Sequence, residues 1–106
     1  MAKYLITGSY PADGAKGLIK DGGSKRLDAV KAAMKSVGGS FETGYFALGE
    51  HDVYAIVDAP DHVAISAIAI AVAASGSVRV TTTALMTAAD VDAAVKKAVS
   101  YTPPGR

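Results

Sequence analysis

The sequence predicts an α+β fold, a four-stranded antiparallel sheet with helices on one face, and three observations predict it. Two β-type runs flank a tight turn at residues 49–52, which is the pattern of a hairpin. Apolar residues at helical spacing lie on either side of that hairpin, at 24–37 and 61–75. One further β-type run opens the chain and another follows the second helix, so the order is β-α-β-β-α-β.

Length and composition indicate one domain over residues 1–106, with a tail at 99–106. Half of the residues are apolar and only 7% are aromatic, so the core must be built from small side chains. Such a core buries little area for each residue. Association of several copies would be a natural supplement to its stability.

Charge and cysteine content exclude several classes of function. The 11 basic and 10 acidic residues leave a net charge of +1, and nucleic-acid binders depend on clustered cations. The chain has no cysteine, which excludes disulfides, thiolate metal sites and a cysteine nucleophile. No signal segment is recognisable, and the apolar run at 63–74 is too short to cross a bilayer. We therefore expect a soluble, cytoplasmic protein with no nucleic-acid or membrane partner.

The first strand is expected at residues 3–10 and ends at Pro11. Residues 12–23 are rich in glycine, which lowers helix propensity by roughly 1 kcal/mol for each residue relative to alanine. We expect a surface connection there with one or two helical turns at most. Its glycines fit neither common phosphate-binding fingerprint.

The first main helix is expected at 24–37, with Ser24 as its N-cap and one apolar stripe at three- and four-residue spacing. Gly38 and Gly39 supply a left-handed stop. Strand two follows at 40–48. Loose alternation along it places Phe41, Thr43, Tyr45 and Ala47 on one face, and Glu42, Gly44, Phe46 and Leu48 on the other.

Strand three is a compact run at 53–58 in which Val53, Ala55 and Val57 share one face and Tyr54 and Ile56 share the other. Asp61 is a natural N-cap for the helix at 61–75. That helix has hardly a charged residue after Asp61, and a helix that is apolar all round is expected to be buried on more than one side.

Strand four is expected at 78–85, where threonines alternate in good β sequence. Thr87 and Asp90 then form a capping arrangement for a third helix at about 88–99. The apolar face of this helix could cover the helix at 61–75 or a neighbouring subunit.

Two right-handed β-α-β halves around a central hairpin give a ferredoxin-like βαββαβ sheet with an extra C-terminal helix. Helices on one face leave the other face bare, and we expect it to carry Tyr54, Ile56 and either Tyr45 or Phe46. An apolar patch of that size favours burial against a second copy across a two-fold axis. The expected partner is therefore the chain itself, as a homodimer or higher homo-oligomer.

The chain resembles the GYD-domain family of small bacterial and archaeal proteins. The matching turn is Gly49-Glu50-His51-Asp52, and the resemblance extends over roughly residues 3–86. It also includes Tyr10 with Gly14, Arg26, the Gly38-Gly39 pair and the Thr-rich last strand. The resemblance implies a dimeric α/β barrel but no established activity. His51 stands where the family usually has tyrosine, which weakens a catalytic role for the turn.

A pocket between the sheet and the helices, roofed by residues 11–23, is one candidate site. Related α/β-barrel folds hold small molecules there, and such a pocket needs apolar walls with a few polar groups. The candidate lining residues are Tyr10, Tyr45, Tyr54, Thr81 and Thr83, with Lys16, Lys20 or Arg26 at the mouth. A tyrosine or arginine there could orient an anionic or phenolic ligand. The alternative is that the tyrosines pack at the dimer face with their hydroxyls at its rim.

Other chemistry has little support in the sequence. His51 with Asp52 and His62 with Asp61 provide too few ligands for a metal site. No serine lies in a Gly-x-Ser-x-Gly elbow, so hydrolase chemistry is not indicated, and no cofactor is predicted. Three hypotheses stay open: a small-molecule-binding module, a cofactor-independent oxygenase or isomerase, and a structural or partner-binding oligomer.

Overall fold

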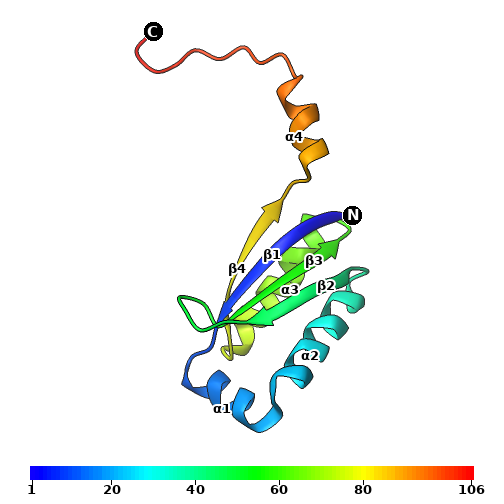
Figure 1. Ribbon diagram of the computed structural model, residues 1–106, viewed down its shortest axis with the longest axis vertical. Helices are drawn as coiled ribbons and strands as arrows, with labels where there is room; N and C mark the ends of the chain where they lie inside the picture. Colours follow the sequence, from blue (N-terminus) through cyan, green and yellow to red (C-terminus); the bar gives the residue numbers. More distant parts are fainter.

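The computed structural model describes all 106 residues and contains one four-stranded antiparallel sheet in the order β2-β3-β1-β4. Its strands are β1 (Ala2–Ser9), β2 (Ser40–Phe46), β3 (Val53–Ala59) and β4 (Arg79–Leu85). In Figure 1 the helix α3 (His62–Ser75) lies behind the sheet and α2 (Gly23–Ser36) runs along its β2 side, and residues of both helices line one cleft with β1, β3 and β4. The predicted ferredoxin-like layout with helices on one face is therefore confirmed.

The core lies between the sheet and these two helices. Met34 of α2 and Val57 of β3 are fully buried, and Tyr4, Ala59 and Ile65 complete the cluster. Gly39 allows the close approach on which this packing depends, since a Cβ there would lie 2.4 Å from the carbonyl oxygen of Asp58. Small side chains and close backbone contact thus build the core, as the composition predicts.

Strand β2 departs from the predicted alternation because a register shift separates Phe41 from Thr43. Phe41 pairs with Val57 and packs against the core, whereas Thr43 pairs with Ile56 on the opposite face. Placing Phe41, Thr43 and Tyr45 on one face was therefore wrong. The extra residue of a β-bulge reverses the alternation at that point. Tyr45, opposite Tyr54, is the aromatic residue of β2 on the bare face.

Residues 12–23 form more regular structure than predicted. They contain the ten-residue helix α1 (Ala12–Asp21), which lies at the lower end of the sheet in Figure 1. One residue, Gly22 with φ +81°, separates α1 from α2. Ser24 is consequently not the N-cap of α2: the helix begins at Gly23, and Gly22 occupies the cap position without a side-chain hydrogen bond.

The cap predicted for α3 is confirmed. The Asp61 side chain accepts a hydrogen bond from the backbone N–H of Ala64 at 2.9 Å, and Gly76 ends the helix in the left-handed conformation. The expectation that α3 is buried on more than one side is wrong for the single chain. Ile65 is its one buried residue, and Val63 and Ile70 are 66% and 70% exposed.

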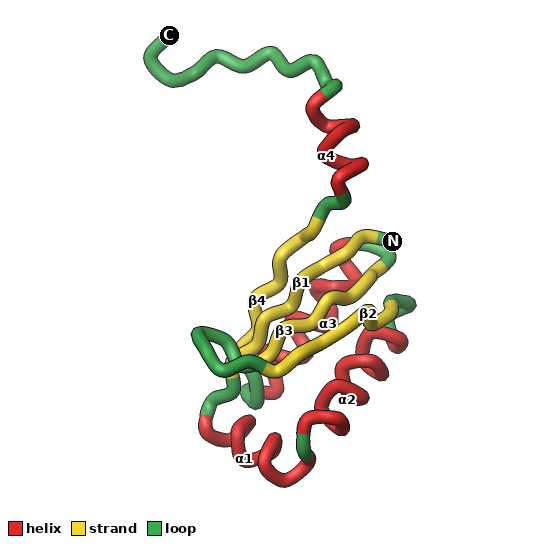
Figure 2. Tube along the Cα trace, in the orientation of Figure 1, coloured by secondary structure: helices red, strands yellow, loops and turns green.

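Helix α4 (Ala88–Val95) and the residues after it form an arm that leaves the body beyond β4 (Figures 1 and 2). Thr87 and Asp90 make the predicted capping box. The arm does not cover α3, and Val91, Val95 and Val99 are exposed. It raises the radius of gyration to 16.9 Å, against about 13 Å for a compact domain of this length.

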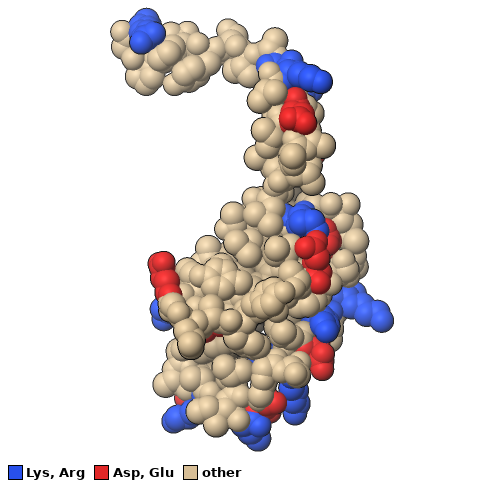
Figure 3. All heavy atoms as spheres, in the orientation of Figure 1, with Lys and Arg blue, Asp and Glu red and all other residues tan.

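The bare face of the sheet is largely uncharged (Figure 3). From the strand pairing, Leu5 and Ile56 lie side by side at its centre with Thr81 and Thr83 beyond them, and Tyr45 lies beside Tyr54. Tyr45 is 71% exposed in the single chain. Charged groups gather at one edge, where Lys3 binds Asp58 and Glu42.

Candidate functional site: a cleft between α2, α3 and the sheet

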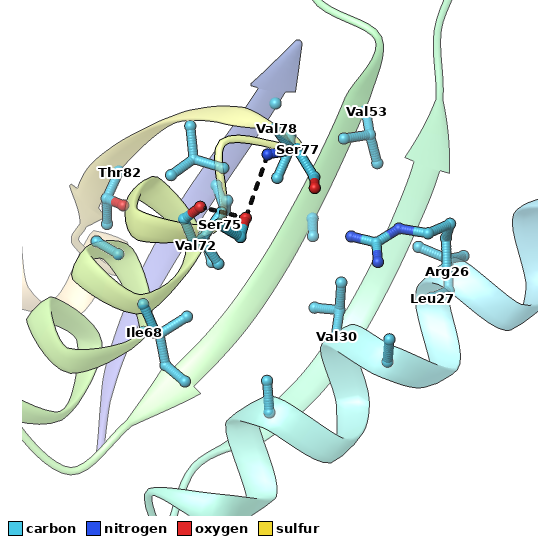
Figure 4. Close-up of a pocket in the computed structure, with 18 of the residues that line it drawn as sticks. Arg26, Leu27, Val30, Val53, Ile68, Val72, Ser75, Ser77, Val78 and Thr82 are labelled. Carbon is cyan, nitrogen blue, oxygen red and sulfur yellow. Dashed lines mark hydrogen bonds between the residues drawn. The ribbon is translucent and has the colours of Figure 1, made fainter. Parts of the chain in front are cut away.

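The helices α2 and α3 stand apart on the sheet, and a cleft of about 370 Å³ lies between them (Figure 4). Its floor is the helix-facing side of β1, β3 and β4, including Ile6, Ala55 and Thr82. Both helices contribute alanines to its walls, at positions 29 and 33 of α2 and at 69 and 71 of α3. Side chains this short leave the space between the helices unfilled.

The wall of the cleft is mainly apolar. Fifteen of its 20 lining residues are hydrophobic, among them Leu27, Val30, Ile68 and Val72. Polar side chains come from Arg26, Ser75, Ser77 and Thr82, and Tyr10, one of the fifteen, adds a hydroxyl; the remaining residue is Gly8. An apolar hollow with a few polar groups is the usual composition of a small-molecule site.

Arg26 is the one charged residue of this wall. Its side chain extends from the first turn of α2 into the space between the helices (Figure 4). The Nε atom is buried and has no hydrogen-bond partner. Arg26 takes part in none of the ion pairs of the chain, and the residue as a whole is half-buried.

A second, polar hollow of about 180 Å³ adjoins the cleft. Tyr10, Arg26 and Ser77 line both spaces, so they mark the place where the two meet. The remaining wall of the polar hollow is from α1 and includes Asp13 and Asp21. Asp21 lies 3.6 Å from Lys25, its ion-pair partner. The cleft therefore has one charged end, at Arg26, and its remainder is apolar except for Ser75 and Thr82.

The β2–β3 turn holds Tyr10 in place. Asp52 Oδ2 accepts a hydrogen bond from the backbone N–H of Tyr10 at 2.8 Å, and the N–H of Asp52 donates to the carbonyl of Gly8 at 2.8 Å. His51 Nδ1 and Ser9 Oγ are hydrogen-bonded at 3.3 Å. The turn is thus tied to the end of β1 at several points, and its contacts orient the chain where β1 passes into α1.

The predicted site residues lie in several different places. Tyr10 and Arg26 line the cleft. Tyr45, Tyr54, Thr81 and Thr83 do not, because they lie on the bare face of the sheet, on the opposite side from the helices. Lys16 and Lys20 are exposed on α1, and Gly49 is exposed in the turn. No residue of 11–23 lines the cleft, so that segment is not its roof; α1 walls the polar hollow instead.

The residues that the prediction missed are Thr82, Ser75 and Ser77, together with the apolar walls of α2 and α3. Thr82 pairs with Ile6, a core-facing residue, which places it on the helix side of β4. Alternation along β4 separates Thr82 from Thr81 and Thr83, and that pattern was a usable signal. Which of the two sets faces the helices depends on the register with β1.

One titratable group has a clearly shifted pKa, and it lies outside the cleft. Hydrogen bonds to Glu42, and then to Asp58 at 3.0 Å, raise the pKa of Lys3 above 10.5, because both carboxylates stabilise its charged form. Nowhere in the chain do three His, Asp or Glu side chains converge as a metal site requires. None of its helices has both the length and the apolar character needed to cross a bilayer.

Comparison with known proteins identifies a family and nothing finer. The family model described as the GYD domain matches residues 4–95, which is most of the chain. No curated protein and no solved structure matches the chain.

Proposed function

The chain belongs to the GYD-domain family, and on that premise we propose that it is a homodimeric small-molecule-binding module whose ligand lies in the cleft between α2 and α3. The observation that carries the proposal is the cleft itself, about 370 Å³ with an apolar wall and one polar end. Apolar surface open to water favours a ligand that removes it from water, by about 25 cal/mol for each Å² buried.

The lining residues favour binding over acid–base catalysis. A general acid or base is most often histidine, aspartate or glutamate. The titratable side chains of the cleft wall are Tyr10 and Arg26. Both are suited to orienting a ligand by hydrogen bonding, and an arginine keeps its proton at all ordinary pH values.

The bare face of the sheet supports the homodimer. Leu5, Ile56, Tyr45 and Tyr54 form an uncharged patch on the side that the helices leave open. The ion pairs of Lys3 lie at its edge, which suits a rim rather than the centre of an interface. A second copy related by a two-fold axis would bury this patch against its own equivalent. The cleft opens on the other side of the sheet and stays accessible in such a dimer.

An uncharged fluorescent probe, N-phenyl-1-naphthylamine, tests the binding function. We expect its fluorescence to rise on addition of the full chain and the rise to saturate. Ala69→Phe places a ring in the cleft and should abolish the signal, because Ala69 lines it. Ala73→Phe is the matched control, since residue 73 is an exposed α3 position outside the cleft.

Circular dichroism of both variants shows whether the fold is retained. Saturable binding that survives in Ala73→Phe and is lost in Ala69→Phe supports the proposal. Equal signals from both variants would place the probe elsewhere on the molecule. That result, or the absence of any saturable signal from the unmodified chain, would refute the cleft as the binding site.

A further inference from the structure

Arg26 lies in the cleft without a counterion. Its Nε is buried and unpaired, and the carboxylates that share the polar hollow with it are those of Asp13 and Asp21. Neither carboxylate has an oxygen within 4.0 Å of an Arg26 nitrogen, the distance that defines an ion pair. A buried, unpaired donor costs free energy, and a charged donor costs more than a neutral one. The site is therefore electrostatically incomplete on the side that faces the cleft.

From this asymmetry we propose that the ligand of the cleft is an apolar carboxylate, with its carboxylate on Arg26 and its hydrocarbon body along α2 and α3. The inference rests on the proposed binding function and adds the chemical class of the ligand. The two terminal nitrogens of an arginine form a fork that matches the two oxygens of a carboxylate. The guanidinium of Arg26 reaches into the space between the helices (Figure 4), and no ion pair of the chain engages it.

The walls around Arg26 favour this ligand over two others. A phosphate ester carries up to two negative charges, and the cleft wall supplies one cation. A polyol or sugar needs many hydrogen-bonding groups, and 15 of the 20 lining residues are hydrophobic. Ser75 is already engaged, since its Oγ donates to the carbonyl of Val72 at 2.6 Å and accepts from the N–H of Ser77 at 3.3 Å (Figure 4).

The direction of the ligand also follows from the lining. The carboxylate lies at the end that Tyr10, Arg26 and Ser77 share with the polar hollow. Ser75, at the C-terminal end of α3, lies close to Ser77. The hydrocarbon body extends from that end toward Ile68, in the middle of α3, and Ile65, near its start. Asp13 and Asp21 lie beyond Arg26, so the cation stands between them and the bound carboxylate.

Displacement of N-phenyl-1-naphthylamine by matched pairs of competitors tests the proposal. The pairs are decanoate with decanol, and 1-naphthoate with 1-naphthalenemethanol, so that each carboxylate is compared with an alcohol of similar size. We expect both carboxylates to bind more tightly than their alcohols at pH 7, by about tenfold or more, because a hydrogen bond to a charged group is stronger than one between neutral groups. The two pairs also distinguish a flexible chain from a flat ring as the apolar body.

Arg26→Gln should remove the preference for the carboxylates and leave the affinity for the alcohols within about twofold, since the apolar wall is unchanged. Lys35→Gln is the matched control: Lys35 is an exposed cation on the same helix, outside the cleft, and its loss should change neither affinity. A measurement on the unmodified chain gives an independent test. The affinity for decanoate should fall below about pH 5 as the carboxylate is protonated, and that for decanol should not.

The outcomes separate this inference from the function on which it rests. If the probe binds and decanol displaces it, but Arg26→Gln leaves the preference for decanoate intact, the binding function stands and the assignment of the carboxylate to Arg26 is overturned. Equal affinity of the unmodified chain for decanoate and decanol overturns the carboxylate proposal as a whole. Failure of the probe itself to bind overturns the binding function.

Discussion

Asp52 and Tyr10, separated in the sequence by α1, α2 and β2, are joined by a 2.8 Å hydrogen bond from the backbone N–H of Tyr10 to the Asp52 carboxylate. The bond fixes the β2–β3 turn against the point where β1 gives way to α1. Tyr10 lines the cleft, so the β2–β3 turn is connected to the cleft wall through the backbone of Tyr10.

Replacing this carboxylate should therefore destabilise the fold. Asp52→Ala leaves the N–H of Tyr10 without its acceptor, and we expect a loss of about 1.5–3 kcal/mol in the free energy of unfolding. Asp52→Asn keeps an acceptor oxygen and should lose less. Urea denaturation followed by circular dichroism measures both, with the exposed Glu50→Ala in the same turn as a control expected to change little. Equal stability of Asp52→Ala and Glu50→Ala would contradict this role.

Two glycines of α1 should respond oppositely to the same substitution. A Cβ at Gly14 would lie 1.7 Å from the carbonyl oxygen of Ser77, whereas a Cβ at Gly17 meets nothing within 4 Å. Gly17→Ala should stabilise the chain by up to about 1 kcal/mol through helix propensity. Gly14→Ala should destabilise it by about 1–3 kcal/mol, because the helix must move away from Ser77. Thermal unfolding of the two variants measures both changes in stability. Equal shifts of the same sign in the melting temperature would contradict the packing of α1 against Ser77.

The proposed dimer makes a prediction about the bare face of the sheet. Ile56→Lys places a charge beside Leu5 at the centre of that face, and we expect it to convert the dimer to a monomer in light scattering at micromolar concentration. Val63→Lys is the matched control, since Val63 is 66% exposed on α3, away from the bare face. A dimer that survives Ile56→Lys, or an unmodified chain that is monomeric, would count against this interface.

The raised pKa of Lys3 leads to a prediction of how the free energy of unfolding changes at alkaline pH. Its pKa is raised in the folded chain, chiefly by Glu42 and then by Asp58. The stabilisation is therefore complete below pH 10.5, the ordinary value, and is lost as the pH rises through the higher folded value. The difference in urea midpoint between the unmodified chain and Lys3→Met should be present at neutral pH and shrink as the pH rises beyond 10.5. The effect is modest, because the Lys3 side chain is 35% exposed. A difference that grows with pH would have the wrong sign.

Periodicity along the sequence was sufficient for the element order, the faces of β3 and the caps of α3 and α4, because these depend on residues close together in the chain. It was insufficient for β2, where one extra residue at Glu42 changes which side chains face the core. It also did not predict the full length of α1. The glycine at position 14 is there because α1 packs closely against Ser77, a residue far away in the sequence.

The candidate site was predictable only in part for the same reason. Tyr10 and Arg26 were among the candidates and line the cleft, whereas Thr81 and Thr83 were chosen in place of Thr82. Alternation separates Thr82 from Thr81 and Thr83, but it does not show which of the two sets faces the helices. The pairing of Thr82 with Ile6 decides which one faces the helices, and that register is a property of the folded sheet.

The free-standing arm has a consequence for how its helix behaves. A helix of eight residues is too short to be stable alone in water, and the capping box of Thr87 and Asp90 supports only its first turn. The valines of this helix stabilise it only when another surface removes their side chains from water. We therefore expect residues 88–95 to be more helical in any assembly that covers Val91 and Val95 than in the isolated chain, which circular dichroism over a range of protein concentrations measures.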